Sequence, residues 1–174
     1  MSASNALKVA AIVRDAGGQV VGRTRLQKLA YLLTVTGCDS GFEFKYKHYG
    51  PFSDDVAVAA RECNLLGLLR EEEKTAGWGG SFFVYTVLQK PCASHSDGER
   101  DSARLQLAKL AASADAIELE LAATAVFLAQ QGCSEPWQET ERRKPEKAEG
   151  RIDRAKSLLS ELKAIIVPRP LPAI

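Results

Sequence analysis

The sequence predicts a mainly α protein with a small antiparallel sheet, an α+β fold with a winged-helix-like N-terminal half and a helical C-terminal half. Three observations lead to this prediction. Three helix patterns occur within the first 66 residues, two strand patterns joined by a glycine-rich turn follow, and only helix patterns occur beyond residue 100. Three helices followed by a β-hairpin is the order of a winged helix-turn-helix domain, here with one more strand between the second and third helices.

Apolar residues at helical spacing predict the first two helices. The first covers residues 5–16, with Asn5 as its cap and two glycines after its end. The second covers residues 23–36. Its apolar stripe consists of Leu26, Leu29, Ala30 and Leu33. Arg25 and Lys28 lie off this stripe, so we expect both side chains to face outward.

Alternating residue types predict the strands. Aromatic and charged residues alternate over residues 42–48, which is typical of a half-buried strand. Ser53 then stands where it would cap a third helix over residues 54–66. Residues 68–72 and 82–88 are the expected strands of the hairpin. The segment Gly77-Trp78-Gly79-Gly80 between them is rich in glycine and supplies the turn.

Composition divides the chain into four segments. Residues 1–90 form the winged-helix-like unit, and residues 91–100 read as a linker. Residues 101–167 form a helical extension that we expect to pack on the first unit. Residues 168–174 form an extended tail, because its three prolines are incompatible with a helix. The helices expected in the extension cover residues 101–111, 115–131, 135–143 and 146–166.

Composition indicates a globular protein without the basic excess of a nucleic-acid binder. The chain has 174 residues, is 45% hydrophobic and carries a formal net charge of +1. Its most apolar stretch, residues 116–129, contains two glutamates and is shorter than the roughly 20 apolar residues that cross a bilayer. No secretory signal precedes the first helix. We therefore expect a cytoplasmic protein with no membrane contact.

No residue pattern predicts catalysis, a metal site or a cofactor. The four cysteines are widely spaced, without a CxxC pair, which favours reduced thiols over a zinc site. His48 ends a strand and His95 lies in the linker, although a Cys–His or Ser–His pair can form between residues that are distant in sequence. The glycines around Trp78 lack the spacing of a phosphate-binding loop. We predict no catalytic residue, no metal ligand, no cofactor and no enzymatic activity.

Aromatic residues at two turns are the candidate partner-binding residues. The segment Tyr49-Gly50-Pro51-Phe52 either aims the third helix at the sheet or presents Tyr49 and Phe52 to a partner. Trp78 stands at the expected hairpin tip, where it either packs back onto the sheet or meets another chain. We hypothesise that Tyr49, Phe52 and Trp78 form a contact surface for a protein partner or a second copy.

Basic residues suggest a further interface. Lys45 and Lys47 are either the solvated face of a strand or, together with Arg25 and Lys28, a binding patch. In a DNA-binding winged helix the third helix enters the major groove. Residues 54–62 contain one arginine and begin with two aspartates, which oppose contacts with phosphate. DNA binding is therefore the alternative, and a protein-interaction or regulatory module is the preferred function.

Four segments resemble a known group of bacterial and archaeal proteins. They are Thr24-Arg25-Leu26-Gln27-Lys28-Leu29-Ala30-Tyr31-Leu32-Leu33, His48-Tyr49-Gly50-Pro51-Phe52-Ser53, Leu119-Glu120-Leu121-Ala122-Ala123-Thr124 and Lys144-Pro145. In this order they resemble the YwgA-like family over most of residues 20–165. The first two segments also resemble, more distantly, the Panacea domain of SocA-like antitoxins. The YwgA-like resemblance implies a fold more than a function, and the Panacea resemblance implies by analogy a protein that neutralises a partner protein.

Overall fold

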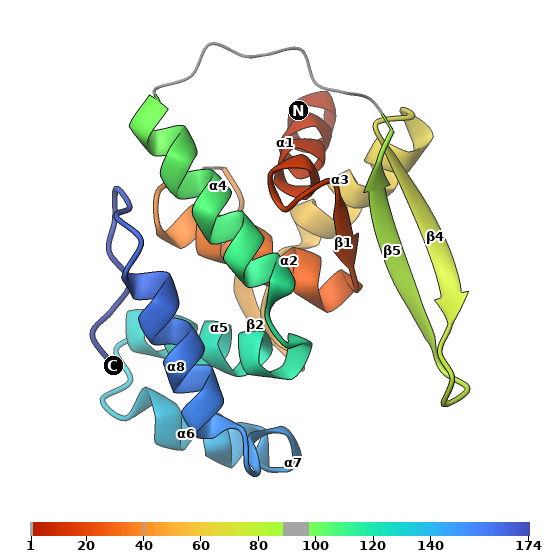
Figure 1. The fold of residues 1–174 in the computed structure, drawn as a ribbon. Helices are drawn as coiled ribbons and strands as arrows, with labels where there is room; N and C mark the ends of the chain where they lie inside the picture. Colours follow the sequence, from red (N-terminus) through yellow and green to blue (C-terminus); the bar gives the residue numbers. More distant parts are fainter. Residues whose placement is uncertain (1, 40, 89–97) are drawn as a thin grey trace.

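Three helices and a three-stranded sheet make up the first half of the chain in the computed structural model, which describes residues 2–39, 41–88 and 98–174. These elements are α1 (Ser2–Asp15), β1 (Gln19–Val21), α2 (Arg23–Val35), α3 (Asp54–Leu65), β4 (Leu69–Thr75) and β5 (Ser81–Val87). The sheet is antiparallel with the order β1-β5-β4, and Figure 1 shows the β4–β5 hairpin extending beyond the helices. The winged-helix-like arrangement of this half is therefore confirmed.

A second, two-stranded sheet lies between α2 and α3 in the chain. Strand β2 (Lys45–Lys47) pairs with β3 (Gly50–Phe52), and His48 and Tyr49 form the turn between them. The predicted strand over residues 42–48 was too long. The chain reverses after Lys47 and returns as a strand where the sequence predicted only a turn, because side chains of α2 hold the returning segment.

Five helices lie within residues 98–174. They are α4 (Gly98–Ser113), α5 (Ala116–Gln130), α6 (Pro136–Arg143), α7 (Pro145–Ala148) and α8 (Ile152–Lys163). The linker predicted over residues 91–100 extended too far, since residues 98–100 belong to α4. Residues 91–97 of that predicted linker lie outside the described part of the chain. The single helix predicted over residues 146–166 is two helices, because Gly150 adopts a φ of +69° that helix geometry excludes.

Local capping decides where two helices begin. The hydroxyl oxygen of Ser53 accepts a hydrogen bond from the backbone N–H of Val56 at 3.4 Å, so Ser53 caps α3 as predicted. Asn5 does not cap α1, because that helix already begins at Ser2.

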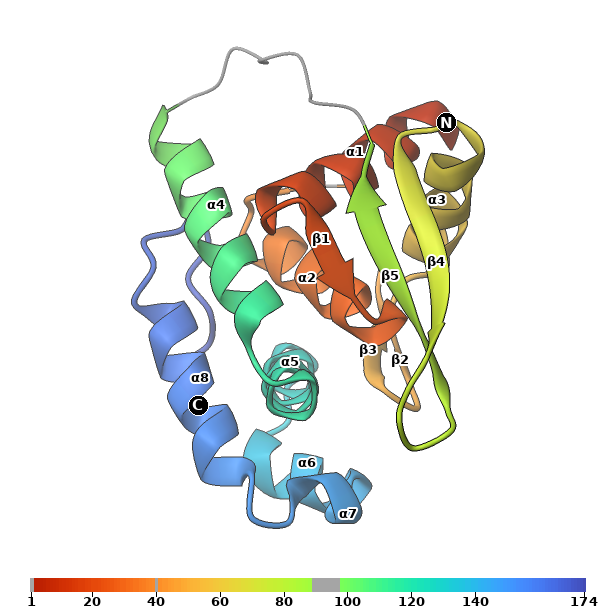
Figure 2. The same ribbon diagram turned by 45° about the vertical axis from the view of Figure 1, so that its right-hand side comes forward.

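One hydrophobic core joins the two halves. Helix α5 is buried over residues 119–128 and contacts α2, α6, α8 and β3. Figure 2 looks along α5, with α8 on one side and the β2–β3 hairpin on the other. Residues 168–174 contain no helix, and Leu171 is buried against this core. No helix in the described part of the chain has the length and apolar character needed to cross a membrane.

Candidate functional site

Two side chains of α2 hold the segment from Tyr49 to Ser53. Gln27 pairs with the backbone of Ser53: its Oε1 accepts from the N–H at 2.8 Å, and its Nε2 donates to the carbonyl oxygen at 3.0 Å. Lys28 Nζ donates to the carbonyl oxygen of Pro51 at 2.8 Å. All three hydrogen bonds are buried, so water does not compete for these groups and the segment is fixed in the unbound protein.

Gly50 lies where this segment meets α5. Its φ of +83° is in the left-handed region that favours glycine. A Cβ atom at this position would clash with Oγ1 of Thr124 and would lie 3.8 Å from Cε of Lys28. Two independent constraints therefore require glycine here: the backbone conformation and the close approach of α5.

A buried carboxylate on α5 binds two lysines beside the same segment. Glu120 Oε1 accepts from Lys144 Nζ at 2.7 Å, and Lys147 Nζ donates to Oε1 at 2.9 Å and to Oε2 at 2.8 Å. Lys144 Nζ also donates to the carbonyl oxygen of His48 at 2.7 Å. Glu120, Lys144 and Lys147, which we call the Glu120 cluster, thus connect α5, the α6–α7 junction and the β2–β3 turn.

The four segments that resemble the YwgA-like family meet at this point. Lys28 comes from the first, Gly50 from the second, Glu120 and Thr124 from the third, and Lys144 from the fourth. Their side chains contact the β2–β3 hairpin or one another. These segments therefore have a common structural task, which is to fix this hairpin between α2 and α5.

Lys28 is almost completely buried, with 1% of its surface exposed. Burial lowers the pKa of its ammonium group from 10.5 to about 7; the charge of Glu120 raises that pKa, and the charges of Lys144 and Lys147 lower it. Three lysines therefore surround one carboxylate, so positive charge predominates beside the hairpin.

The pKa of Lys28 predicts a pH dependence of stability. Because the pKa is lower in the folded chain than in the unfolded chain, the unfolded chain binds more protons between about pH 7 and pH 10.5. This contribution to stability is present above pH 10.5 and is lost as the pH falls through 7. From pH 7 to pH 9, we expect wild type to gain on the order of 2 kcal/mol of unfolding free energy relative to Lys28→Met.

Urea unfolding at both pH values measures this difference. The exposed Lys109 on α4 provides the control, because its replacement with Met leaves the Lys28 contribution in place. If the unfolding free energies of the wild type and of Lys28→Met change in parallel with pH, burial does not lower the pKa of Lys28.

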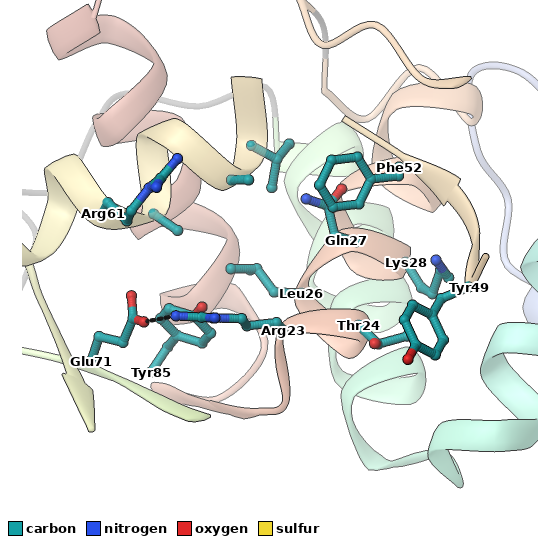
Figure 3. Close-up of a pocket in the computed structure, with 13 residues that line it drawn as sticks. Arg23, Thr24, Leu26, Gln27, Lys28, Tyr49, Phe52, Arg61, Glu71 and Tyr85 are labelled. Carbon is teal, nitrogen blue, oxygen red and sulfur yellow. Dashed lines mark hydrogen bonds and ion pairs between the residues drawn. The ribbon is translucent and has the colours of Figure 1, made fainter. Parts of the chain in front are cut away.

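A pocket of about 380 Å³ opens on the other side of the hairpin segment. It lies between α2, α3, β3 and the inner face of the β4–β5 hairpin, and Figure 3 shows the residues that line it. Its apolar lining includes Leu26, Phe52, Val56, Ala60 and Tyr85. Its volume lies in the range of small-molecule and side-chain pockets, which are mostly apolar with a few polar groups.

Four charged residues line this pocket: Arg23, Lys28, Arg61 and Glu71. Arg23 donates to Glu71 Oε1 at 2.8 Å, and its guanidinium carbon lies 3.4 Å from the ring centroid of Phe83. Glu71 is half-buried in this pair. The pocket therefore joins an apolar interior to a predominantly basic edge.

The structure brings two of the three predicted partner-binding residues to this pocket. Tyr49 is 57% exposed, Phe52 is half-buried, and both line the pocket. Lysines contact both rings: Lys147 Nζ lies 4.5 Å from the Tyr49 centroid, and Lys47 Nζ lies 4.0 Å from the Phe52 centroid. Trp78 is not part of this lining; at the β4–β5 turn it is 81% exposed and does not pack back onto the sheet.

The four basic residues do not form one exposed patch. The expectation that Lys28 faces outward was wrong, because α5 and the β2–β3 hairpin cover that side of α2. Arg25 is half-buried and donates to the carbonyl oxygens at the end of α4, those of Ala112 and Ala114. Lys45 and Lys47 are exposed, but both pair with Asp54.

Among the described residues, no serine or cysteine forms a hydrogen bond with the side chain of His48. His48 is exposed, and its carbonyl oxygen accepts from Lys144. His95 lies outside the described residues. Among the residues that the structure describes, no three His, Cys, Asp or Glu side chains are grouped so that they could hold a metal ion.

Sequence reasoning missed Gln27, Glu120, Thr124 and the lysines of the Glu120 cluster as site residues. One signal was available: Glu120 interrupts the most apolar stretch of the chain, where a buried carboxylate needs partners. The partners themselves, Lys144 and Lys147, are 24 and 27 residues away. No spacing rule connects residues at that separation.

One curated protein similar to this chain is the uncharacterized protein YwgA of Bacillus subtilis (strain 168), which is 27% identical over 81 residues. The match covers 46% of this chain and 49% of YwgA, so the chain spans about half the length of that relative. No family model matches the chain, and no solved structure matches it. The similarity supports a YwgA-like family, and the link to the Panacea domain stays a prediction.

Proposed function

We propose that this chain is a non-enzymatic protein-interaction or regulatory module that binds a partner at the pocket bordered by Tyr49 and Phe52. The observation that carries the proposal is an open apolar pocket beside two aromatic residues on a rigidly held hairpin. Tyrosine and tryptophan are among the residues that dominate binding energy at protein interfaces. A second aromatic contact, Trp78 at the tip of the β4–β5 hairpin, extends the proposed surface.

The β2–β3 hairpin is held rigidly by other residues, so the exposed Tyr49 is better suited to binding a partner than to stabilising the fold. Gln27 and Lys28 fix its backbone from one side, and Lys144 holds the carbonyl oxygen of His48 from the other. A surface that is already ordered loses little conformational entropy when a partner binds.

The winged-helix arrangement favours DNA binding as the second candidate, but the surface charges oppose it. Helix α3, which would enter the major groove, begins with Asp54 and Asp55. At its other end Leu65 is 84% exposed and Leu66 is exposed as well. Carboxylates repel phosphate, and exposed leucines suit a protein surface better than a groove of DNA.

The regulatory role that the Panacea resemblance implies is the neutralisation of a toxin. We place this possibility within the same proposal, since a neutralising protein also works by binding another protein. The pocket and its aromatic border are the surface on which we expect such a partner to bind.

Photo-cross-linking tests the proposal. A benzoylphenylalanine at position 52, with one at the exposed position Leu105 on α4 as the control, is used to capture partners in native lysate. Binding to the purified partner is then measured for Tyr49→Ala, Phe52→Ala and Trp78→Ala. We expect at least one variant to lose about 30-fold in affinity, the effect of a typical interface hot spot, while Leu105→Ala binds like the wild type.

Stability is measured on the same variants. Trp78→Ala is expected to unfold like the wild type, because its ring is mostly in solvent. Unchanged partner affinity in all three variants contradicts the proposed surface. A nanomolar complex with one duplex, resistant to competitor DNA, would instead establish the DNA-binding alternative.

A further inference from the structure

We infer that the partner presents an acidic segment to this pocket: an apolar side chain that enters it and a neighbouring carboxylate that pairs at its edge. The inference rests on the proposed function and adds the chemistry of the partner. It is drawn from the shape, the apolar lining and the charge of the pocket between α2, α3, β3 and the β4–β5 hairpin.

The interior of the pocket suits one large apolar side chain. Leu26, Val56 and Ala60 supply aliphatic surface, and Phe52 and Tyr85 supply aromatic surface. A volume of about 380 Å³ is enough for an aromatic or branched side chain without a longer stretch of polypeptide. Burial of such a side chain against this lining supplies the hydrophobic part of the affinity.

The charged residues of the pocket leave positive charge uncompensated. Of the three basic residues that line it, Arg23 is paired with the one lining carboxylate, Glu71, and burial disfavours the charge of Lys28. Arg61 lies on the α3 side, and within the described part of the chain no carboxylate forms an ion pair with it. Figure 3 shows Arg61 and Lys28 on opposite sides of the pocket. Because Lys28 is buried, Arg61 is the charged group that a ligand in the pocket can pair with.

Lysines on one side of the pocket add positive charge. Behind Lys28, the Glu120 cluster places two further lysines around a single carboxylate. Lys147 also extends to the exposed ring of Tyr49 at the edge of the pocket. Arg61 and Lys147 therefore favour an anion at this edge of the pocket.

A carboxylate fits this arrangement better than the phosphates of nucleic acid. The exposed Asp54 and Asp55 flank the pocket on α3, and the exposed Glu72 and Glu73 follow Glu71 on β4. These carboxylates oppose a continuous polyanion that would run across the surface. A partner with a single acidic side chain beside an apolar anchor pairs with the basic edge and does not run across these carboxylates.

Two small probes of equal shape separate the apolar part of the inference from the charged part. The full chain is titrated with 2-naphthoate and with the neutral 2-naphthamide, and binding is followed by the NMR shifts of backbone amides around the pocket. We expect 2-naphthoate to bind about two- to fivefold more tightly, as one ion pair at an exposed site provides. A single-stranded oligonucleotide is titrated in parallel and is expected not to shift these amides.

Four variants locate the two effects. Arg61→Gln is expected to remove the preference for 2-naphthoate, whereas Arg70→Gln keeps it, because Arg70 precedes Glu71 on β4 and points to the opposite face of the strand. Ala57→Trp fills the pocket and is expected to weaken both probes. Val58→Trp, the next residue on α3, lies outside the lining and serves as its control.

The outcomes distinguish this inference from the proposed function. Equal affinity for the two probes, or a preference that survives Arg61→Gln, overturns the acidic partner even if a protein still binds at Phe52. Binding of neither probe, or of the oligonucleotide alone, overturns it as well. The proposed function fails separately, when a partner is found whose affinity does not respond to Tyr49→Ala, Phe52→Ala or Trp78→Ala.

Discussion

Glu120→Ala is expected to lower the free energy of unfolding by about 3–5 kcal/mol, the cost of removing one partner from a buried ion pair. Glu120 is 3% exposed, and it accepts hydrogen bonds from Lys144, which is buried, and from Lys147, which is partly exposed. Without the carboxylate, the ammonium group of Lys144 keeps one hydrogen bond to the described residues, which it donates to the carbonyl oxygen of His48. Urea unfolding measures the loss.

Two further variants show that the loss comes from the buried charge. Glu118, on the same helix, is half-buried and faces Arg154 at 3.8 Å, and the side chain of Arg154 is 75% exposed, so Glu118→Ala is expected to cost no more than about 1 kcal/mol. Combining Glu120→Leu with Lys144→Met removes both buried charges and should recover much of the stability that Glu120→Ala loses. If Glu120→Ala costs as little as Glu118→Ala, the cluster is not a buried anchor of the hairpin.

Gly50→Ala is the second large effect, with an expected loss of about 2–5 kcal/mol. The left-handed backbone conformation contributes about 1–2 kcal/mol, and the clash of the new Cβ with Thr124 Oγ1 contributes about 1–3 kcal/mol. Because the clash pushes the hairpin away from α5, we also expect the hydrogen bond from Lys28 to Pro51 to weaken. Thermal or urea unfolding gives the total.

Gly79 separates the two contributions. It has a φ of +90°, and a Cβ atom added to it would meet no other atom within 4 Å, so Gly79→Ala carries only the backbone strain. In a Thr124→Ala background the clash with Oγ1 is absent, and Gly50→Ala should then cost about as much as Gly79→Ala, about 1–2 kcal/mol. If Gly50→Ala and Gly79→Ala lose equal stability in the wild-type background, α5 moves away from the new Cβ atom without lowering the free energy of unfolding.

The sequence by itself determined the elements that depend on local chemistry. Helix α3 begins after Ser53 as predicted, because a serine hydroxyl caps the N–H groups of the first turn regardless of the rest of the fold. The β4–β5 hairpin was predicted from its strand patterns and its glycine-rich turn, and the order of elements that makes the first half winged-helix-like followed from these patterns. The sequence also placed Tyr49 at a turn, and Tyr49 lines the pocket together with Phe52 of β3.

Tertiary structure alone decided which charged residues are buried. Helical spacing placed Lys28 outside the apolar stripe, but α2 is covered on more than one side, and residues 26–33 are all buried. For the same reason Glu120 lies inside the core, where partners more than 20 residues away satisfy it. Hydrophobic periodicity describes a helix with one buried face, so it fails for helices that other elements surround. The pocket likewise exists only because α2, α3 and two hairpins meet around it, which no segment of the sequence specifies alone.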